Sequence, residues 1–121
     1  MDPEKRDALA RAKARLDRMA LYPAPVSLRG VRVWFVPWLF RVPWFRRFDG
    51  YAVHGTVLLR RALQPADDDL LTHELCHVWQ MQHRPLAMPL SYLRQGYERN
   101  PYEIEARDAV EKTREDSVRG I

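Results

Sequence analysis

Residues 70–83 read LLTHELCHVWQMQH and contain two histidines, His73 and His77, spaced four positions apart. On an α-helix such positions lie one turn apart on the same side, so both imidazoles can reach one point. Two imidazole nitrogens in that arrangement suit a tetrahedral Zn²⁺ ion with bonds of about 2.0–2.1 Å. The stretch therefore predicts a helix that supplies half of a zinc site.

The residue after the first histidine is Glu74. It is rotated about 100° from His73 around the helix, too far to join the two histidines as a ligand. A carboxylate at this position flanks the open side of a metal ion, where it can take a proton from water. A purely structural zinc site would gain nothing from it and would normally fill the fourth position with protein. The pattern therefore favours catalysis.

The surrounding sequence predicts that this helix covers residues 66–83 and lies at the edge of a core. Pro65 and the aspartates after it are typical of a helix start, and Arg84 with Pro85 ends it. Leu71, Leu75 and Val78 form an apolar stripe on a helical wheel, and the histidines lie beside this stripe. That position suits side chains that line a cleft.

The rest of the chain predicts a single α+β domain, residues 1–121. The expected elements are an amphipathic helix at 3–20, strands at 31–36 and 51–60, the helix at 66–83, and a last helix at 102–118. Within residues 51–60, Gly55 suggests a bulge or a close backbone approach. Residues 85–101 are expected to form a loop, with a short helical turn at 91–97.

A catalytic zinc site needs a third protein ligand, and the last helix offers two glutamates, Glu103 and Glu105. Its buried face is expected to carry Ala106, Ala109, Val110 and Thr113. Glu103 lies about 60° from the centre of that face and Glu105 about 100°. We therefore expect Glu103 to be the ligand, with Glu105 as the alternative.

HELCHVWQ followed by EIEARDA resembles the zincin metallopeptidases of the glutamate-ligand (gluzincin) type. In several of these families the third ligand opens an E-x-x-A-[DN] motif, and residues 103–106 match its first four positions. Arg107 stands where the families usually have Asp or Asn, and Asp108 follows one place later. This departure keeps Glu105 open as the ligand. The resemblance covers about residues 51–110.

The resemblance implies a compact peptidase with one zinc ion per chain. Water activated by zinc and deprotonated by Glu74 would attack a peptide carbonyl, and Glu74 would pass the proton to the leaving amine. The substrate would lie extended along the edge strand, within residues 52–59. His54 on that strand is a candidate for contacting the substrate or the oxyanion. The candidates for a phenol that hydrogen-bonds the transition state are Tyr92, Tyr97 and Tyr102.

The charge and hydropathy pattern limits other functions. The net charge of +4 is diffuse and accompanies no nucleic-acid-binding motif, so no specific nucleic-acid partner is expected. The most apolar stretch, residues 31–45, contains two prolines and two arginines and is too short for a membrane span. The N-terminus is charged throughout, so no secretory signal is expected, and a cytoplasmic location is the default interpretation.

Residues 31–48 are aromatic and flanked by arginines, which leaves two interpretations open. The segment either covers the small core or contacts a partner or a membrane surface. In the second case the chain could be a non-catalytic, metal-stabilised binding or regulatory module instead of a peptidase. Whether a peptidase of this size needs a partner, or is inhibited by its own residues 117–121, is also left open by the sequence.

Overall fold

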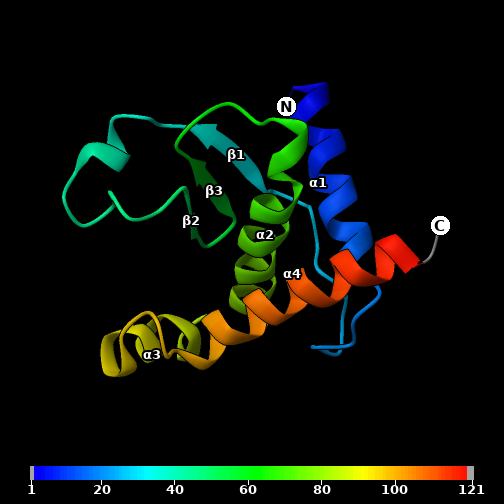
Figure 1. The fold of residues 1–121 in the computed structure, drawn as a ribbon. Coiled ribbons are helices and arrows are strands. Elements are labelled where there is room, and N and C mark those ends of the chain that lie inside the picture. The colour runs from blue at the N-terminus through cyan, green and yellow to red at the C-terminus, as the bar shows by residue number, and fades with distance from the viewer. Residues whose placement is uncertain (1, 120–121) are drawn as a thin grey trace.

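The computed structural model describes the backbone of residues 2–119 and their side chains, except those of residue 65 and residues 115–119. This part of the chain confirms the α+β class, with four α-helices and a three-stranded mixed sheet (Figure 1). The helices are α1 (Pro3–Leu16), α2 (Asp68–His83), α3 (Ala87–Gln95) and α4 (Pro101–Arg119). The strands are β1 (Arg32–Phe35), β2 (Gly50–Val53) and β3 (Thr56–Leu59), and two short 3-10 helices are η1 (Leu39–Arg41) and η2 (Pro65–Asp67).

The sheet corrects one prediction. Residues 51–60 do not form a single bulged strand, because His54 and Gly55 make a tight turn between β2 and β3. His54 has a φ of 53°, a left-handed conformation that lets the chain reverse, and Val53 then pairs with Thr56. His54 therefore lies in a hairpin turn and not on a strand.

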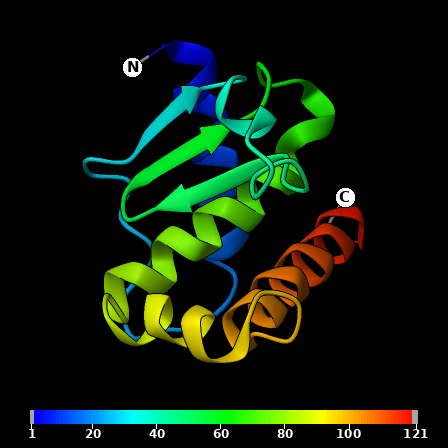
Figure 2. The same ribbon diagram turned by 90° about the vertical axis from the view of Figure 1, so that its left-hand side faces the viewer.

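The strand order β1-β3-β2 places β3 in the centre, parallel to β1 and antiparallel to β2. Among the described strands β2 pairs with β3 alone, so its outer edge remains available. This edge strand is shorter than the sequence suggested, and only residues 52 and 53 of the expected substrate-binding stretch, 52–59, belong to it. Figure 2 shows one face of the sheet packed on α2.

The helix α2 is the centre of the fold, between the sheet and α1, with α4 crossing it (Figures 1 and 2). Its predicted apolar stripe, Leu71, Leu75 and Val78, is fully buried. On α4, the small side chains of Ala106 and Ala109 are also fully buried and allow the two helices to approach closely. The core thus fixes α4 against the helix that carries both histidines.

The helix α3 replaces most of the loop expected at residues 85–101, and α1 ends at Leu16, four residues before the predicted end. Pro89 is the third residue of α3. Its missing N–H is one of the groups that have no partner in the first turn of any helix, so it does not interrupt the hydrogen bonding. Gly96, with a φ of 75°, ends this helix.

Part of the aromatic segment, residues 31–48, covers the core, as the first interpretation expects, and part of it is exposed. Phe40 and Phe48 are buried and cover the core, while Trp34, Trp38 and Trp44 are at least half exposed. Contact with a partner or a membrane surface stays a prediction. Among the described residues no helix is both long and apolar enough to cross a bilayer. The side chains of the suggested inhibitory segment, residues 117–121, lie outside the part of the chain that the structure describes.

Candidate metal centre

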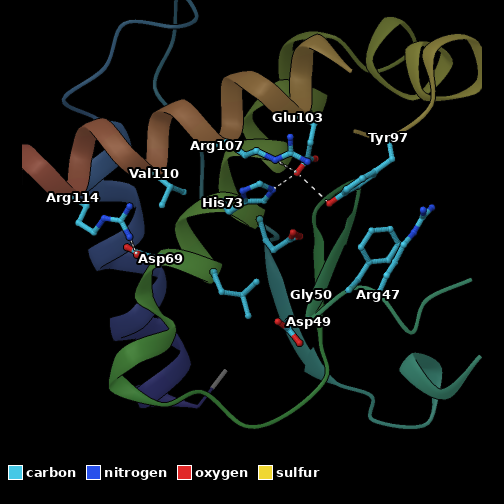
Figure 3. Close-up of a pocket in the computed structure, with 13 residues that line it drawn as sticks. Arg47, Asp49, Gly50, Asp69, His73, Tyr97, Glu103, Arg107, Val110 and Arg114 are labelled. Carbon is cyan, nitrogen blue, oxygen red and sulfur yellow. Dashed lines mark hydrogen bonds and ion pairs between the residues drawn. The ribbon is translucent and has the colours of Figure 1, made fainter. Parts of the chain in front are cut away.

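Two neighbouring helices bring His73, His77 and Glu103 together. The Nε2 atom of His73 lies 2.8 Å from one carboxylate oxygen of Glu103, and the Nε2 atom of His77 lies 2.9 Å from the other. The two Nε2 atoms are 3.2 Å apart. Figure 3 shows His73 on α2 directed at Glu103 on α4. These three residues form a group that could hold a metal ion.

The start of α4 places Glu103. The side-chain oxygen of Asn100 accepts a hydrogen bond from the backbone N–H of Tyr102 at 2.8 Å, and Pro101 occupies the first helical position. Glu103 follows in the first turn, where its carboxylate also complements the helix dipole. Its side chain is almost completely buried against α2.

The hydrogen bonds of His77 indicate that the three side chains fit a cation. Gln80 uses its amide nitrogen to donate to the carbonyl of Tyr102 and to Glu105, so its oxygen faces the Nδ1 atom of His77 at 2.8 Å and accepts from it. In the neutral imidazole the proton is therefore on Nδ1, and the Nε2 lone pair points at the carboxylate of Glu103. Two electron-pair donors that face each other need a positive ion between them.

The separation of the two histidine nitrogens approaches the expected coordination, whereas the contacts of 2.8 Å and 2.9 Å to Glu103 have hydrogen-bond length and would have to widen around an ion. Ligand atoms about 2.0–2.1 Å from a tetrahedral zinc ion lie about 3.3–3.4 Å apart, and the two imidazole nitrogens are separated by 3.2 Å. Two histidines with one glutamate form a known ligand set of catalytic zinc sites. The donor chemistry therefore suits a metal ion, and Zn²⁺ is one ion that takes these ligands.

Electrostatics favour a cation at the same point. Burial opposes ionisation of Glu103, but hydrogen bonds from His73 and His77 outweigh burial and hold the pKa of this carboxyl well below its usual range. Burial alone would lower the pKa of His77, yet its hydrogen bond to Glu103 and the charge of Glu74 raise it. The same negative field that favours a proton on His77 would favour a metal ion in its place.

Glu74 lies beside this group, and its carboxyl is buried. Its side chain is 4% exposed, and its Oε2 atom has no hydrogen-bond partner among the described residues. Burial raises the pKa of this carboxyl, and Glu103 adds to the rise while His77 and His73 oppose it. A buried carboxylate oxygen without a partner is costly, which is the reason that burial favours the neutral form of this carboxyl.

The alternative ligand, Glu105, points elsewhere. Its Oε1 atom accepts hydrogen bonds from the hydroxyl of Tyr22 at 2.7 Å and from Gln80 at 3.1 Å. Glu103 thus converges with the histidines, and Glu105 does not. Arg107, the departure from the family motif, lies with its Nε 3.6 Å from Glu103 and its guanidinium donating to the backbone of Glu98.

Two of the three candidate tyrosines reach the centre. The hydroxyls of Tyr92 and Tyr97 donate to Glu103 at 3.2 Å and 3.1 Å. Burial, together with the charge of Glu103, raises the pKa of both phenols, so both remain donors at neutral pH. Tyr102 contributes its backbone carbonyl to Gln80. His54 is exposed at the hairpin turn, where it lines a pocket next to the centre.

Two pockets meet at Glu74. The first, of about 430 Å³, is lined mainly by α2, by α4 and by residues 47–50, which lead into β2 (Figure 3). The second, of about 560 Å³, lies between β2 and α3 above His77. Together they form a cleft that runs beside the available edge of β2.

Gln80 is the main residue that the sequence reasoning missed. A signal was present, because Gln80 follows His77 by three positions and therefore lies on the same side of the helix. Tyr22 carried no such signal, since it comes from the loop after α1 and reaches Glu105 only through the tertiary fold.

Comparison with protein-family models, curated proteins and solved structures finds no significant match for this chain. The fold and the centre define an α+β protein with a possible metal site.

Proposed function

We propose that the chain is a zinc-dependent peptidase. The observation that carries the proposal is the position of Glu74, a buried carboxylate with an unpartnered oxygen, beside the three converging ligands His73, His77 and Glu103. A purely structural metal site has no use for this fourth group. A hydrolytic site requires a base at that point.

Each residue has a distinct role in this proposal. His73, His77 and Glu103 would hold one Zn²⁺, which, when bound, supplies Lewis acidity for water and for a peptide carbonyl. Glu74 takes a proton from the attacking water and later donates it to the leaving amine. Burial raises the pKa of this carboxyl, which makes its carboxylate a stronger base.

The edge of β2 supports a peptide as the substrate. An extended peptide can pair with an available strand edge through backbone hydrogen bonds, which fixes its position largely independently of its sequence. The cleft beside β2 leads past Glu74, so a peptide paired with this strand would present a carbonyl to the centre. Tyr97, Tyr92 and His54 line the same cleft and are the candidates for further contacts with the bound peptide.

Metal removal tests the proposal. Elemental analysis of the purified protein is expected to give about one zinc per chain, and the protein is expected to cleave a broad mixture of fluorogenic peptides. Dialysis against a chelator should abolish cleavage, and one equivalent of zinc should restore it. Cleavage that survives complete removal of metal would overturn the proposal. One bound zinc without cleavage of any peptide in the mixture would instead favour the non-catalytic binding module.

A further inference from the structure

The two halves of the cleft differ in chemistry. The half beside α4 includes the charged groups Asp69, Arg107 and Arg114. The half between β2 and α3, called here the apolar pocket, has walls formed largely by Val53, Met81, Met88, Tyr92 and Leu93. Arg47, which the two halves share, also lines this pocket, but a charged side chain enclosed by the five residues named above would lose water and find no charge among them.

The rim of the apolar pocket is also apolar. Leu93 is 84% exposed, and Trp44 and Val53 are about half exposed at the opposite wall. Large apolar side chains gathered around a concavity are a common sign of a binding site, because their exposure is costly until a ligand covers them. Met81 and Met88 can adjust to ligands of different shape, since their side chains are flexible.

We propose that the apolar pocket is a specificity pocket that accepts a bulky apolar side chain, such as that of leucine, methionine or phenylalanine, from a peptide paired with β2. The inference rests on the proposed peptidase function, because the pocket borders the metal centre at Glu74 and His77. The charged half of the cleft lies on the other side of Glu74. Selection for an apolar side chain therefore acts on one side of the scissile bond.

Peptide libraries varied at single positions give the first test. At one position next to the scissile bond, phenylalanine or leucine is expected to raise kcat/KM over alanine by about 10- to 200-fold, the usual range for an apolar pocket, and aspartate should fall below alanine. On the opposite side of the scissile bond, the spread among side chains should be smaller.

A matched pair of variants locates the preference. Leu93 lines the apolar pocket, whereas Leu86, at the start of the same helix and 75% exposed, is not among its lining residues. Leu93→Asp is expected to lower kcat/KM for the leucine peptide at least 10-fold, and Leu86→Asp to change it less than 2-fold. Both side chains are exposed, so neither substitution should disturb folding, which circular dichroism would check.

Peptide binding separates this inference from the proposed function. Labelled leucine and aspartate peptides are titrated against the Glu74→Gln protein, and fluorescence anisotropy gives Kd. Tighter binding of the leucine peptide, weakened by Leu93→Asp alone, supports the pocket even if no hydrolysis is ever found. Cleavage or binding without an apolar preference, or equal effects of the two leucine substitutions, overturns the pocket and leaves the peptidase function intact.

A second, independent observation concerns a buried chain of polar groups behind His77. Gln80 is completely buried and holds three hydrogen bonds, to His77, to the carbonyl of Tyr102 and to Glu105. Glu105 in turn accepts from the hydroxyl of Tyr22. Because the amide nitrogen of Gln80 is committed to two acceptors, its oxygen is fixed toward His77 and cannot exchange places with the nitrogen.

We infer that Gln80 is a positioning residue, oriented by Glu105, that keeps the Nε2 lone pair of His77 directed at the metal centre. Removal of such a partner typically costs 10- to 100-fold in metal affinity. Gln80→Leu is therefore expected to weaken zinc binding by about this factor in competition with a chromophoric chelator. Glu105→Gln should weaken it in the same direction by a smaller factor.

Gln82 provides the matched control. It lies two residues further along α2, is exposed, and bonds only to the backbone of Ser27 among the described contacts. Gln82→Leu should bind zinc like the original protein. The absorption spectrum of bound Co²⁺ should change in Gln80→Leu alone, because loss of stability by itself does not alter coordination. Zinc affinities of Gln80→Leu and Glu105→Gln equal to that of Gln82→Leu would overturn the inference.

Discussion

Glu74→Gln is expected to retain one zinc ion per chain and to lower kcat for peptide hydrolysis by about 10²- to 10⁴-fold. Glutamine has the same shape but cannot accept the proton of the attacking water. None of the three proposed ligands is changed, so the metal content should be unaltered. The measurements are elemental analysis, and kcat with the best peptide from the library.

The control for this substitution is Asp49→Asn. Asp49 also lines the cleft, but its side chain is largely exposed and makes a long ion pair of 3.7 Å with Arg60. Loss of this charge should change kcat by less than about 3-fold, because an exposed pair contributes little. If Glu74→Gln hydrolysed peptides as fast as Asp49→Asn, the general-base role would be wrong.

Glu74→Gln should also show that the group needed for catalysis lowers the stability of the fold. The folded chain holds a carboxyl with a raised pKa and an unpartnered oxygen, so its charged form destabilises the fold. A neutral amide removes the cost of burying that charge. The metal-free Glu74→Gln protein is therefore expected to melt at a higher temperature than the metal-free original, as is common when a catalytic group is replaced.

Most of what could be predicted from the sequence came from the spacing of residues along a single helix. The arrangement of His73, Glu74 and His77 depends only on helix geometry, so it follows once a helix is expected there. Glu103 was favoured because the alanines of α4 indicated its buried face, and that face does pack on α2. Both inferences used the periodicity of one helix at a time.

Features that depend on contacts between distant segments were not predictable in this way. The residues on both sides of Gly55 favour a strand whether the chain continues or reverses, and the left-handed conformation of His54 decided the matter. The partners of Glu105 come from α2 and from the loop after α1. One wall of the apolar pocket is formed by α3, in a stretch for which a loop was expected.

The second large effect is expected from the two glutamates of α4. Glu103→Ala should lose stoichiometric zinc, and with it all hydrolysis, because only two ligands would remain. His77→Ala should behave in the same way. Glu105→Ala should still bind one zinc per chain at saturating metal, since its carboxylate lies behind Gln80 and not among the converging atoms. Equilibrium dialysis with elemental analysis gives the stoichiometry directly.

Thermal unfolding supplies a readout that does not depend on activity. An ion that binds the folded chain alone stabilises it by about 4 kcal/mol when its concentration is a thousand times Kd. Zinc should therefore raise the melting temperature of the original protein and of Glu105→Ala, and leave that of Glu103→Ala unchanged. The opposite pattern, with zinc stabilising Glu103→Ala and not Glu105→Ala, would mean that Glu105 turns toward the histidines when metal binds. The ligand set is proposed on the ground that Tyr22 and Gln80 hold Glu105 away from the histidines. That result would show the proposed ligand set to be wrong.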